Sequence, residues 1–161
     1  MTLSELIRKI EVAASGTPSV SSIVRNDIFR LNSLPNAEYA VFGWTQGQHY
    51  TTVSSSLITY NFTFFYIDRL RADKRNELEI QSVGIQVLDN LIRTLELNGV
   101  YAESQYNFTT FNQRFLDECA GVFTNVALTV PVSDLCEETY ADFNDDFNVD
   151  FAIGNGGVKI Y

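Results

Sequence analysis

One stretch decides the fold of this chain: YNFTFFYI (Tyr60–Ile67), then DRLRADKR (Asp68–Arg75), then NELEIQSVGIQVLDNLIRTLELN (Asn76–Asn98), closed by Gly99. Aromatic and β-branched residues fill the first part, a composition typical of a β-strand. The middle part is a charged connection, and the last part has the spacing of a long helix. A long strand that leads into one long amphipathic helix predicts an α+β layer structure.

The long helix is predicted from a stripe of apolar residues spaced three and four apart. The stripe consists of Ile80, Val83, Val87, Leu88, Leu91, Ile92 and Leu95. Asn76 and Glu79 have the spacing of a capping box at its start, with Asp73 as a rival N-cap. Gly84 lies in the stripe and permits a close approach of a neighbouring element. Gly99 follows the helix as a left-handed stop.

The N-terminal region predicts a second, shorter helix over residues 3–14, which Thr2 or Ser4 can cap. The helix is expected to end at Ser15–Pro18. Residues 19–34 contain short apolar runs without a consistent period. Asp27–Leu31 fit a helical turn, and Val20, Ile23 and Val24 fit an extended run.

A long hairpin is predicted between the two helices. Its first strand covers residues 39–44, a turn around Gly47 covers residues 45–48, and the return strand covers residues 49–67. Ser54–Ser56 mark either a bulge or a place where two strands meet. A hairpin of this length would reach beyond its own core, where it could contact a neighbouring subunit.

Two further strands follow the long helix. The first covers residues 100–110 with an interruption at 103–105, and the second covers residues 122–130 and stops at Pro131. Residues 111–121 are expected to form a compact connection.

The fold class is therefore α+β, with an antiparallel sheet of two hairpins, an N-terminal helix and one long helix packed on a face, plus an extended acidic C-terminal arm. The core domain is expected over residues 1–135 and the arm over residues 136–161.

The arm repeats an Asp-Phe pair every four residues, at Asp142-Phe143, Asp146-Phe147 and Asp150-Phe151. The spacing fits a helix with three phenylalanines on one face, and it also fits a strand with acids opposite the aromatics. Asp, Asn, Phe and Val are mediocre helix formers, which favours the extended form. Exposed aromatics usually mark contacts, so we expect an arm that docks on a partner, by strand addition to a neighbour's sheet edge. A solvated acidic edge is the alternative.

No stretch predicts a catalytic, cofactor-binding or metal-binding residue. Asp142, Asn144 and Asp146 match the first EF-hand ligands, but Phe147 stands where that loop needs glycine and Ile153 where it needs glutamate. A specific calcium site is therefore not predicted.

Three weaker candidates for chemistry remain. His49, the only histidine, lies beside the predicted turn, where a surface role is commoner than catalysis. The densest acidic cluster next to a thiol is Asp117-Glu118-Cys119, and nothing in the sequence singles it out. The glycines at 154–157 lack the Lys-Ser/Thr ending of a phosphate-binding loop.

Composition places the chain among globular domains. It has 161 residues, of which 45% are hydrophobic, enough for one domain with a core. No apolar run approaches the ~20 residues of a membrane helix, and the N-terminus lacks a signal-peptide pattern. A protein made and kept in a cytoplasm is expected, with Cys119 and Cys136 as free thiols.

The net charge of −9 is unevenly distributed. Residues 134–161 contain seven acidic residues and one basic residue, Lys159, and so carry most of the excess. An acidic chain without a basic stripe argues against gripping nucleic acid. It does not argue against DNA passing by, because a negative wall repels phosphates.

The one basic cluster consists of Arg69, Arg71, Lys74 and Arg75, interleaved with Asp68 and Asp73. Local ion pairs are one interpretation, contact with an acidic neighbour such as the arm of another copy is a second, and phosphate binding is a third.

This order of elements resembles the small neck and tail-junction proteins of tailed bacteriophages: tail terminators, tail-completion proteins and head–tail connector ring proteins. The stretches that carry the likeness are residues 62–95 and 111–130, and it covers roughly residues 1–135. The acidic arm lies outside the family pattern. The resemblance implies a non-enzymatic virion protein, assembled in the host cytoplasm.

Copies would form a ring around the DNA channel, with a hexamer or dodecamer as candidates. The ring would contact other neck, portal or tail proteins, and DNA would pass without sequence-specific binding. The expected docking anchors are Phe143, Phe147 and Phe151 with Asp142, Asp146 and Asp150, and their partners are Arg69, Arg71, Lys74 and Arg75. The alternatives are a small cytoplasmic α+β enzyme and a soluble binding or adaptor module.

Overall fold

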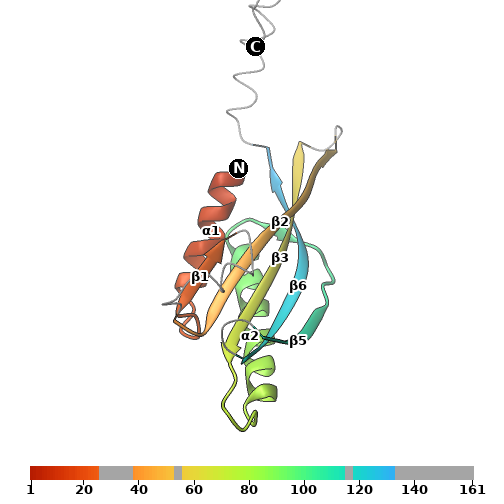
Figure 1. Ribbon diagram of the computed structural model, residues 1–161. Helices are drawn as coiled ribbons and strands as arrows, with labels where there is room; N and C mark the ends of the chain where they lie inside the picture. Colours follow the sequence, from red (N-terminus) through yellow and green to blue (C-terminus); the bar gives the residue numbers. More distant parts are fainter. Residues whose placement is uncertain (26–37, 53–55, 115–117, 133–161) are drawn as a thin grey trace, which may run out of the picture.

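The computed structural model describes residues 1–25, 38–52, 56–114 and 118–132. Over these residues the chain forms two helices and a mixed six-stranded sheet, which confirms the α+β class (Figure 1). In chain order the elements are α1 (Leu3–Ser15), β1 (Ser22–Arg25), β2 (Val41–Thr52), β3 (Leu57–Arg69), α2 (Glu77–Leu97), β4 (Tyr101–Ala102), β5 (Phe108–Arg114) and β6 (Glu118–Pro131).

The sheet has the strand order β1-β2-β3-β6, and β4 and β5 both pair with the far side of β6. β1 runs parallel to β2, whereas the other described pairs are antiparallel. The expectation of a wholly antiparallel sheet is therefore wrong. β1 comes from the segment without a clear pattern, and four residues become a strand there because β2 supplies a ladder for them.

The turn predicted at residues 45–48 is also wrong, because β2 continues through it to Thr52. The β2–β3 register shifts between the Gln46–Phe62 and His49–Tyr60 pairs, so Gly47 and Gln48 form a bulge. The Asn61 side-chain amide donates to the Gln48 carbonyl oxygen over 2.5 Å and holds the bulge in place. The ladder then runs on to the Thr52–Leu57 pair.

β6 is the longest strand and pairs with all thirteen residues of β3, from Leu57–Pro131 to Arg69–Cys119. The compact connection predicted over residues 111–121 is wrong at both ends, because β5 continues to Arg114 and β6 begins at Glu118. The alternating pattern of the strands was obscured there by Gly121, which faces Phe111 across the ladder.

Both helices cover one face of the sheet (Figure 1). The predicted stripe of α2 is confirmed: of its members, Val83 is half-buried and the other six are buried. Gly84 is buried as well, and a Cβ there would lie 3.0 Å from the ring of Tyr66 and 3.1 Å from Val122. The glycine thus lets the helix sit close to β3 and β6, as the sequence suggested.

The two helices begin differently. Thr2 caps α1 with the predicted geometry: the Glu5 amide donates to the Thr2 hydroxyl oxygen, and the Thr2 amide donates to the Glu5 carboxylate over 2.7 Å. The capping box predicted for α2 is absent, since the Asn76 side chain makes no bond to the first-turn amides. Its amide group is engaged with the preceding loop instead.

The opposite face of the sheet carries a smaller apolar cluster near the β1 end, made of Val24, Val41, Phe65, Ile67 and Cys119. Within the described residues, no helix is long and apolar enough to cross a membrane. The acidic arm and the boundary near residue 135 lie outside the described residues, so they stay predictions.

Candidate interaction surfaces

The predicted basic cluster lies in one loop between β3 and α2, residues 69–75, and the loop is held by defined bonds. The Asn76 side chain accepts from the Arg71 amide over 2.9 Å and donates to the Arg69 carbonyl oxygen over 3.1 Å. The Leu70 amide donates to the Glu118 carbonyl oxygen over 2.9 Å, which ties the loop to the start of β6. The loop therefore presents its side chains from a fixed backbone.

Most of its cations have partners within the same copy. Lys74 lies 3.2 Å from the Glu118 carboxylate, and Arg75 lies 3.3 Å from that of Asp73. Arg69 stacks over the ring of Tyr39, 5.0 Å from its centroid. Residues 68–79 contain four basic and four acidic side chains, so the loop region has no net charge. Local pairing thus weakens, without removing, the attraction that this loop offers to an acidic arm.

The proposed anchors on the arm are not among the described residues. These are Phe143, Phe147, Phe151, Asp142, Asp146 and Asp150. The last described residue before the arm is Val132, whose amide donates to the Ser56 carbonyl oxygen over 2.9 Å. This point lies at the opposite end of the β3–β6 ladder from the basic loop (Figure 1), ~40 Å away at ~3.3 Å per residue.

A second surface, the free edge of β2, was missed from the sequence because a turn was expected there. β1 pairs only with Val41–Trp44, so residues 45–52 have no strand on their outer side in the described part of the chain. We call residues 45–52 the β2 edge. It contains neither a charged residue nor a proline, the usual devices that keep sheet edges from pairing.

The β2 edge differs on its two sides. On the helix side, the His49 ring packs edge-on against Tyr60, with ring centroids 5.0 Å apart. His49 is thus an exposed strand residue that rests on core aromatics, and it does not lie in a turn. On the other side, the register places Tyr50, Thr59, Thr129 and Tyr101 in one row across four strands.

On that other side, the rows of β2, β3 and β6 near the hairpin end carry polar side chains without charge. The hydroxyls of Thr59 and Thr129 lie 2.9 Å apart, and the Thr63 hydroxyl donates to the Asn125 side chain over 2.7 Å. Both tyrosines that flank this row are exposed, Tyr50 by 54% and Tyr101 by 65%. A shallow depression of about 220 Å³ lies beside these groups, lined in part by Gly47, Asn61 and Glu103.

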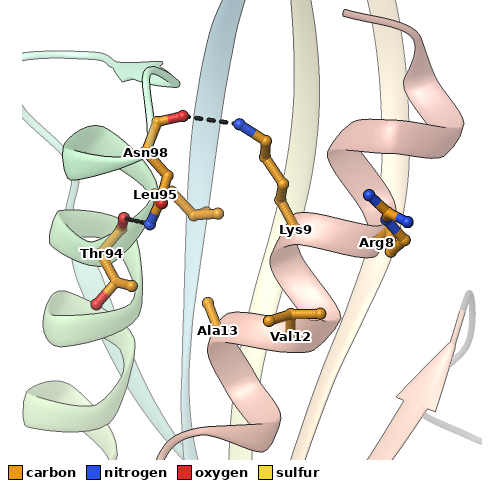
Figure 2. Close-up of a pocket in the computed structure, with 7 residues that line it drawn as sticks. All are labelled: Arg8, Lys9, Val12, Ala13, Thr94, Leu95 and Asn98. Carbon is orange, nitrogen blue, oxygen red and sulfur yellow. Dashed lines mark hydrogen bonds between the residues drawn. The ribbon is translucent and has the colours of Figure 1, made fainter.

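A third surface is the groove between the two helices, with a volume of about 310 Å³ (Figure 2). Lys9 crosses its upper end and donates to the Asn98 carbonyl oxygen over 2.8 Å. This bond places a positive charge at the C-terminal end of α2, whose own last turn has no basic residue. Val12 lines the groove and is 66% exposed.

One ionisable cluster has shifted pKa values. The Asp89 carboxylate accepts from Arg93 over 2.7 Å and from the Tyr106 hydroxyl over 2.8 Å. The bond from Arg93 is the main cause that lowers the pKa of Asp89, and the bond from Tyr106 adds to it. Burial, with the bond to Asp89, raises the pKa of Tyr106 to about 12. The cluster fastens the segment before β5 onto α2, which is a structural role.

The weaker candidates for chemistry do not converge on one site. Cys119 is buried in the apolar cluster of the second face, while the neighbouring Glu118 carboxylate faces Lys74. Asp117 lies outside the described residues. Among the described residues, no three His, Cys, Asp or Glu side chains gather as metal ligands would.

No protein-family model matches this chain, and no curated protein matches its sequence. Function is therefore inferred from the three surfaces described above. Two of them lie near opposite ends of the central ladder, and they differ in chemistry: an uncharged strand edge and a loop of alternating charges.

Proposed function

We propose that this chain is a structural subunit that assembles with copies of itself into a closed ring. The ring would surround the DNA channel at the head–tail junction or tail end of a tailed bacteriophage, in contact with other neck, portal or tail proteins. The observation that carries the proposal is that one subunit has two exposed surfaces of different chemistry. The β2 edge lies toward one end of the sheet and the loop of residues 69–75 lies at the other.

Unlike surfaces are what a ring requires, because each subunit meets its two neighbours through different patches. The loop is suited to such a contact, since its backbone is fixed before any partner arrives. Arg71 is exposed, and no ion pair of its side chain is found among the described residues, so it remains available to a carboxylate of a neighbour.

The neutral face near the hairpin end supports a position beside DNA. Thr59, Thr63, Asn125 and Thr129 offer hydroxyl and amide groups, and no lysine or arginine lies in these rows of the sheet. Without cations, such a face does not bind DNA phosphates through counterion release. It also adds no charge that would slow DNA as it moves past. The chain's excess of negative charge acts in the same direction.

The finer organisation belongs to the same proposal. Residues 1–135 would form the core domain, and residues 136–161 would form the acidic arm that links neighbours. Phe143, Phe147 and Phe151 would be the apolar anchors of the arm. Asp142, Asp146 and Asp150 would line its opposite side.

A soluble binding or adaptor module is the second candidate, and the groove between α1 and α2 favours it. The groove combines an exposed valine with Arg8 and Lys9, which would suit an acidic peptide. A module of this kind would not need to assemble, so its mass in solution separates it from a ring subunit.

The mass of the full chain and of a chain truncated after Cys136 tests the proposal by light scattering over a range of concentrations. We expect the full chain to form one discrete oligomer and the truncated chain to lose it. A full chain that stays monomeric at every concentration would overturn the ring. An oligomer that survives truncation unchanged would remove the arm from the interface.

A further inference from the structure

Within the described residues, the β2 edge has an outer side without a strand partner. Eight consecutive residues, Thr45–Thr52, pair with β3 on one side, and no strand lies on their other side among the described residues. Unpaired amides and carbonyls along such an edge gain hydrogen bonds when an extended segment is added. The question is which segment takes this place.

The far side of β6 carries two other edges, those of β4 and β5. β4 consists of only Tyr101 and Ala102, at the levels of Thr129 and Leu128, which is too short for a strand interface. The edge of β5 does not fit in a closed ring. The positions of both edges can be compared along β6. β5 pairs directly with residues 118–124 of β6, whereas the β2 edge aligns, through β3, with residues 125–131 of β6. Pairing the two edges would shift each copy along the strands by about seven residues, or ~23 Å. A repeated shift of this kind makes an open helical array.

Pairing of two β2 edges is opposed by the bulge. Gly47 and Gln48 interrupt the straight ladder in the middle of the edge, between the Gln46–Phe62 and His49–Tyr60 pairs. Two rigid copies would bring their bulges to the centre of the same contact, where pairing is already disturbed. A segment that adapts its path can follow a bulged edge, so a flexible partner is favoured over a second rigid edge.

The acidic arm has the position, the length and the pattern for this role. The chain reaches Val132 at the hairpin end, where its amide bonds to Ser56, close to the open end of the β2 edge. Ten further residues lead to Asp142, a span of up to ~33 Å when extended. From Asp142 to Phe151, the odd positions share one side of a strand and carry four apolar residues and one acid: Phe143, Asp145, Phe147, Val149 and Phe151.

We infer that the β2 edge binds the segment Asp142–Phe151 of a neighbouring copy as an added antiparallel strand. The inference rests on the proposed assembly, which is why the neighbour's segment is chosen over the chain's own. The aromatic side of the segment would continue the helix side of the sheet, beside His49 and Tyr60. Its acidic side would lie over the face that holds Thr63 and Asn125, where the β2, β3 and β6 rows carry no charge and Glu103 is the carboxylate of the adjoining depression.

Disulfide trapping between two different chains tests this directly. One chain carries Gln48→Cys and the other carries Asn148→Cys, both in a Cys136→Ser background, and only one of them bears a mass tag. We expect a mixed disulfide to form at least about tenfold faster than with Gln86→Cys, an exposed position on α2, because docking raises the effective thiol concentration. Cysteines at residues 144 and 146 cover other registers.

A proline in the segment provides the second measurement. Asn148→Pro removes an amide from the added strand and should abolish the preference for position 48, using Asn144→Cys or Asp146→Cys as the reporter. Asn155→Pro, placed beyond the segment, should leave the preference intact. Neither substitution touches the described core, so misfolding does not confuse the comparison.

Several results would overturn the inference. These are equal trapping at positions 48 and 86, trapping only between two copies of the Gln48→Cys chain, or a disulfide formed only within one chain that carries both cysteines. If the chains assemble by light scattering while position 48 is not trapped, edge docking fails and the ring proposal stands. If the chains remain monomeric, both fail.

Discussion

Gly121 shows at the scale of one residue how closely the central strands are packed. A Cβ at this position would fall against the Tyr66 carbonyl oxygen and lie 2.7 Å from the ring of Phe111. Backbone cannot yield as a flexible side chain does, so the ladder between β3 and β6 has to shift when the methyl group is added.

Replacing Gly121 by alanine should therefore lower the free energy of unfolding by about 1–3 kcal/mol, the usual range for overpacking. Chemical denaturation of the variant and the parent measures the difference. Gly16→Ala is the matched control, because a Cβ there meets only ordinary contacts at 3.6 Å, and its effect should stay within about 0.5 kcal/mol. Equal effects of the two substitutions would contradict this account of Gly121.

Tyr106 is the second residue with a clear consequence. Its pKa is raised from 10.0 to about 12 by burial and by the bond to Asp89. Because the pKa of Tyr106 is higher in the folded protein than in the unfolded chain, its protonated hydroxyl contributes fully to stability below pH 10. This contribution is lost as the pH rises toward 12.

The difference in unfolding free energy between the parent and Tyr106→Phe should therefore shrink across that alkaline range. Denaturation at several pH values checks it. The other seven tyrosines are the same in both proteins, so the readout is the difference between the two stability curves. A difference that stays constant to the top of the range would show that the hydroxyl has an ordinary pKa.

At the scale of elements, the loop of residues 69–75 depends on Asn76 more than on its own charges. The side chain of Asn76 bonds to the backbone of both Arg69 and Arg71, while the ion pairs of Lys74 and Arg75 are exposed to solvent. Exposed pairs contribute little, so the amide side chain is the main constraint.

Asn76→Ala should thus speed hydrogen exchange of the Arg71 amide, which loses its acceptor, while leaving exchange in β3 unchanged. Asp73→Ala is a suitable comparison, because it removes the partner of Arg75 and should have little effect on the Arg71 amide. Protection of that amide in Asn76→Ala equal to that in the parent would contradict the assignment.

Elements whose signal is local could be predicted from the sequence. The stripe of α2, the cap at Thr2 and the aromatic run of β3 each lie within a short window, and the structure bears them out. Gly47 could not be assigned, since a glycine between polar residues looks alike in a turn and in a bulge. The bulge depends on the Asn61 side chain, which donates across the ladder to the Gln48 carbonyl oxygen.

The candidate surfaces, too, could be predicted only where their residues are close together in the sequence. The four cations of the loop were found from the sequence, but Glu118, which pairs with Lys74, is distant in the chain. The β2 edge was missed because a turn was expected at residues 45–48, and the pairing of residues 49–52 with β3 depends on partners distant in the chain. Asn76 was read as a cap because its role in the loop depends on the path of the preceding residues.

At the scale of the whole molecule, we propose that copies of this chain close into a ring. Exposed surfaces of unlike chemistry at the two ends of the central ladder would supply the two sides of a head-to-tail contact. Direct pairing of the β2 edge with β5 would build an open helical array, because the two edges are offset along the strands, so it is not the contact of a closed ring.

Negative-stain electron microscopy of the purified full-length chain tests this claim most directly. We expect closed rings of one copy number with a central channel, and we expect these rings to be lost when residues 137–161 are removed. Monomers at every concentration, or open helical filaments in place of rings, would contradict it.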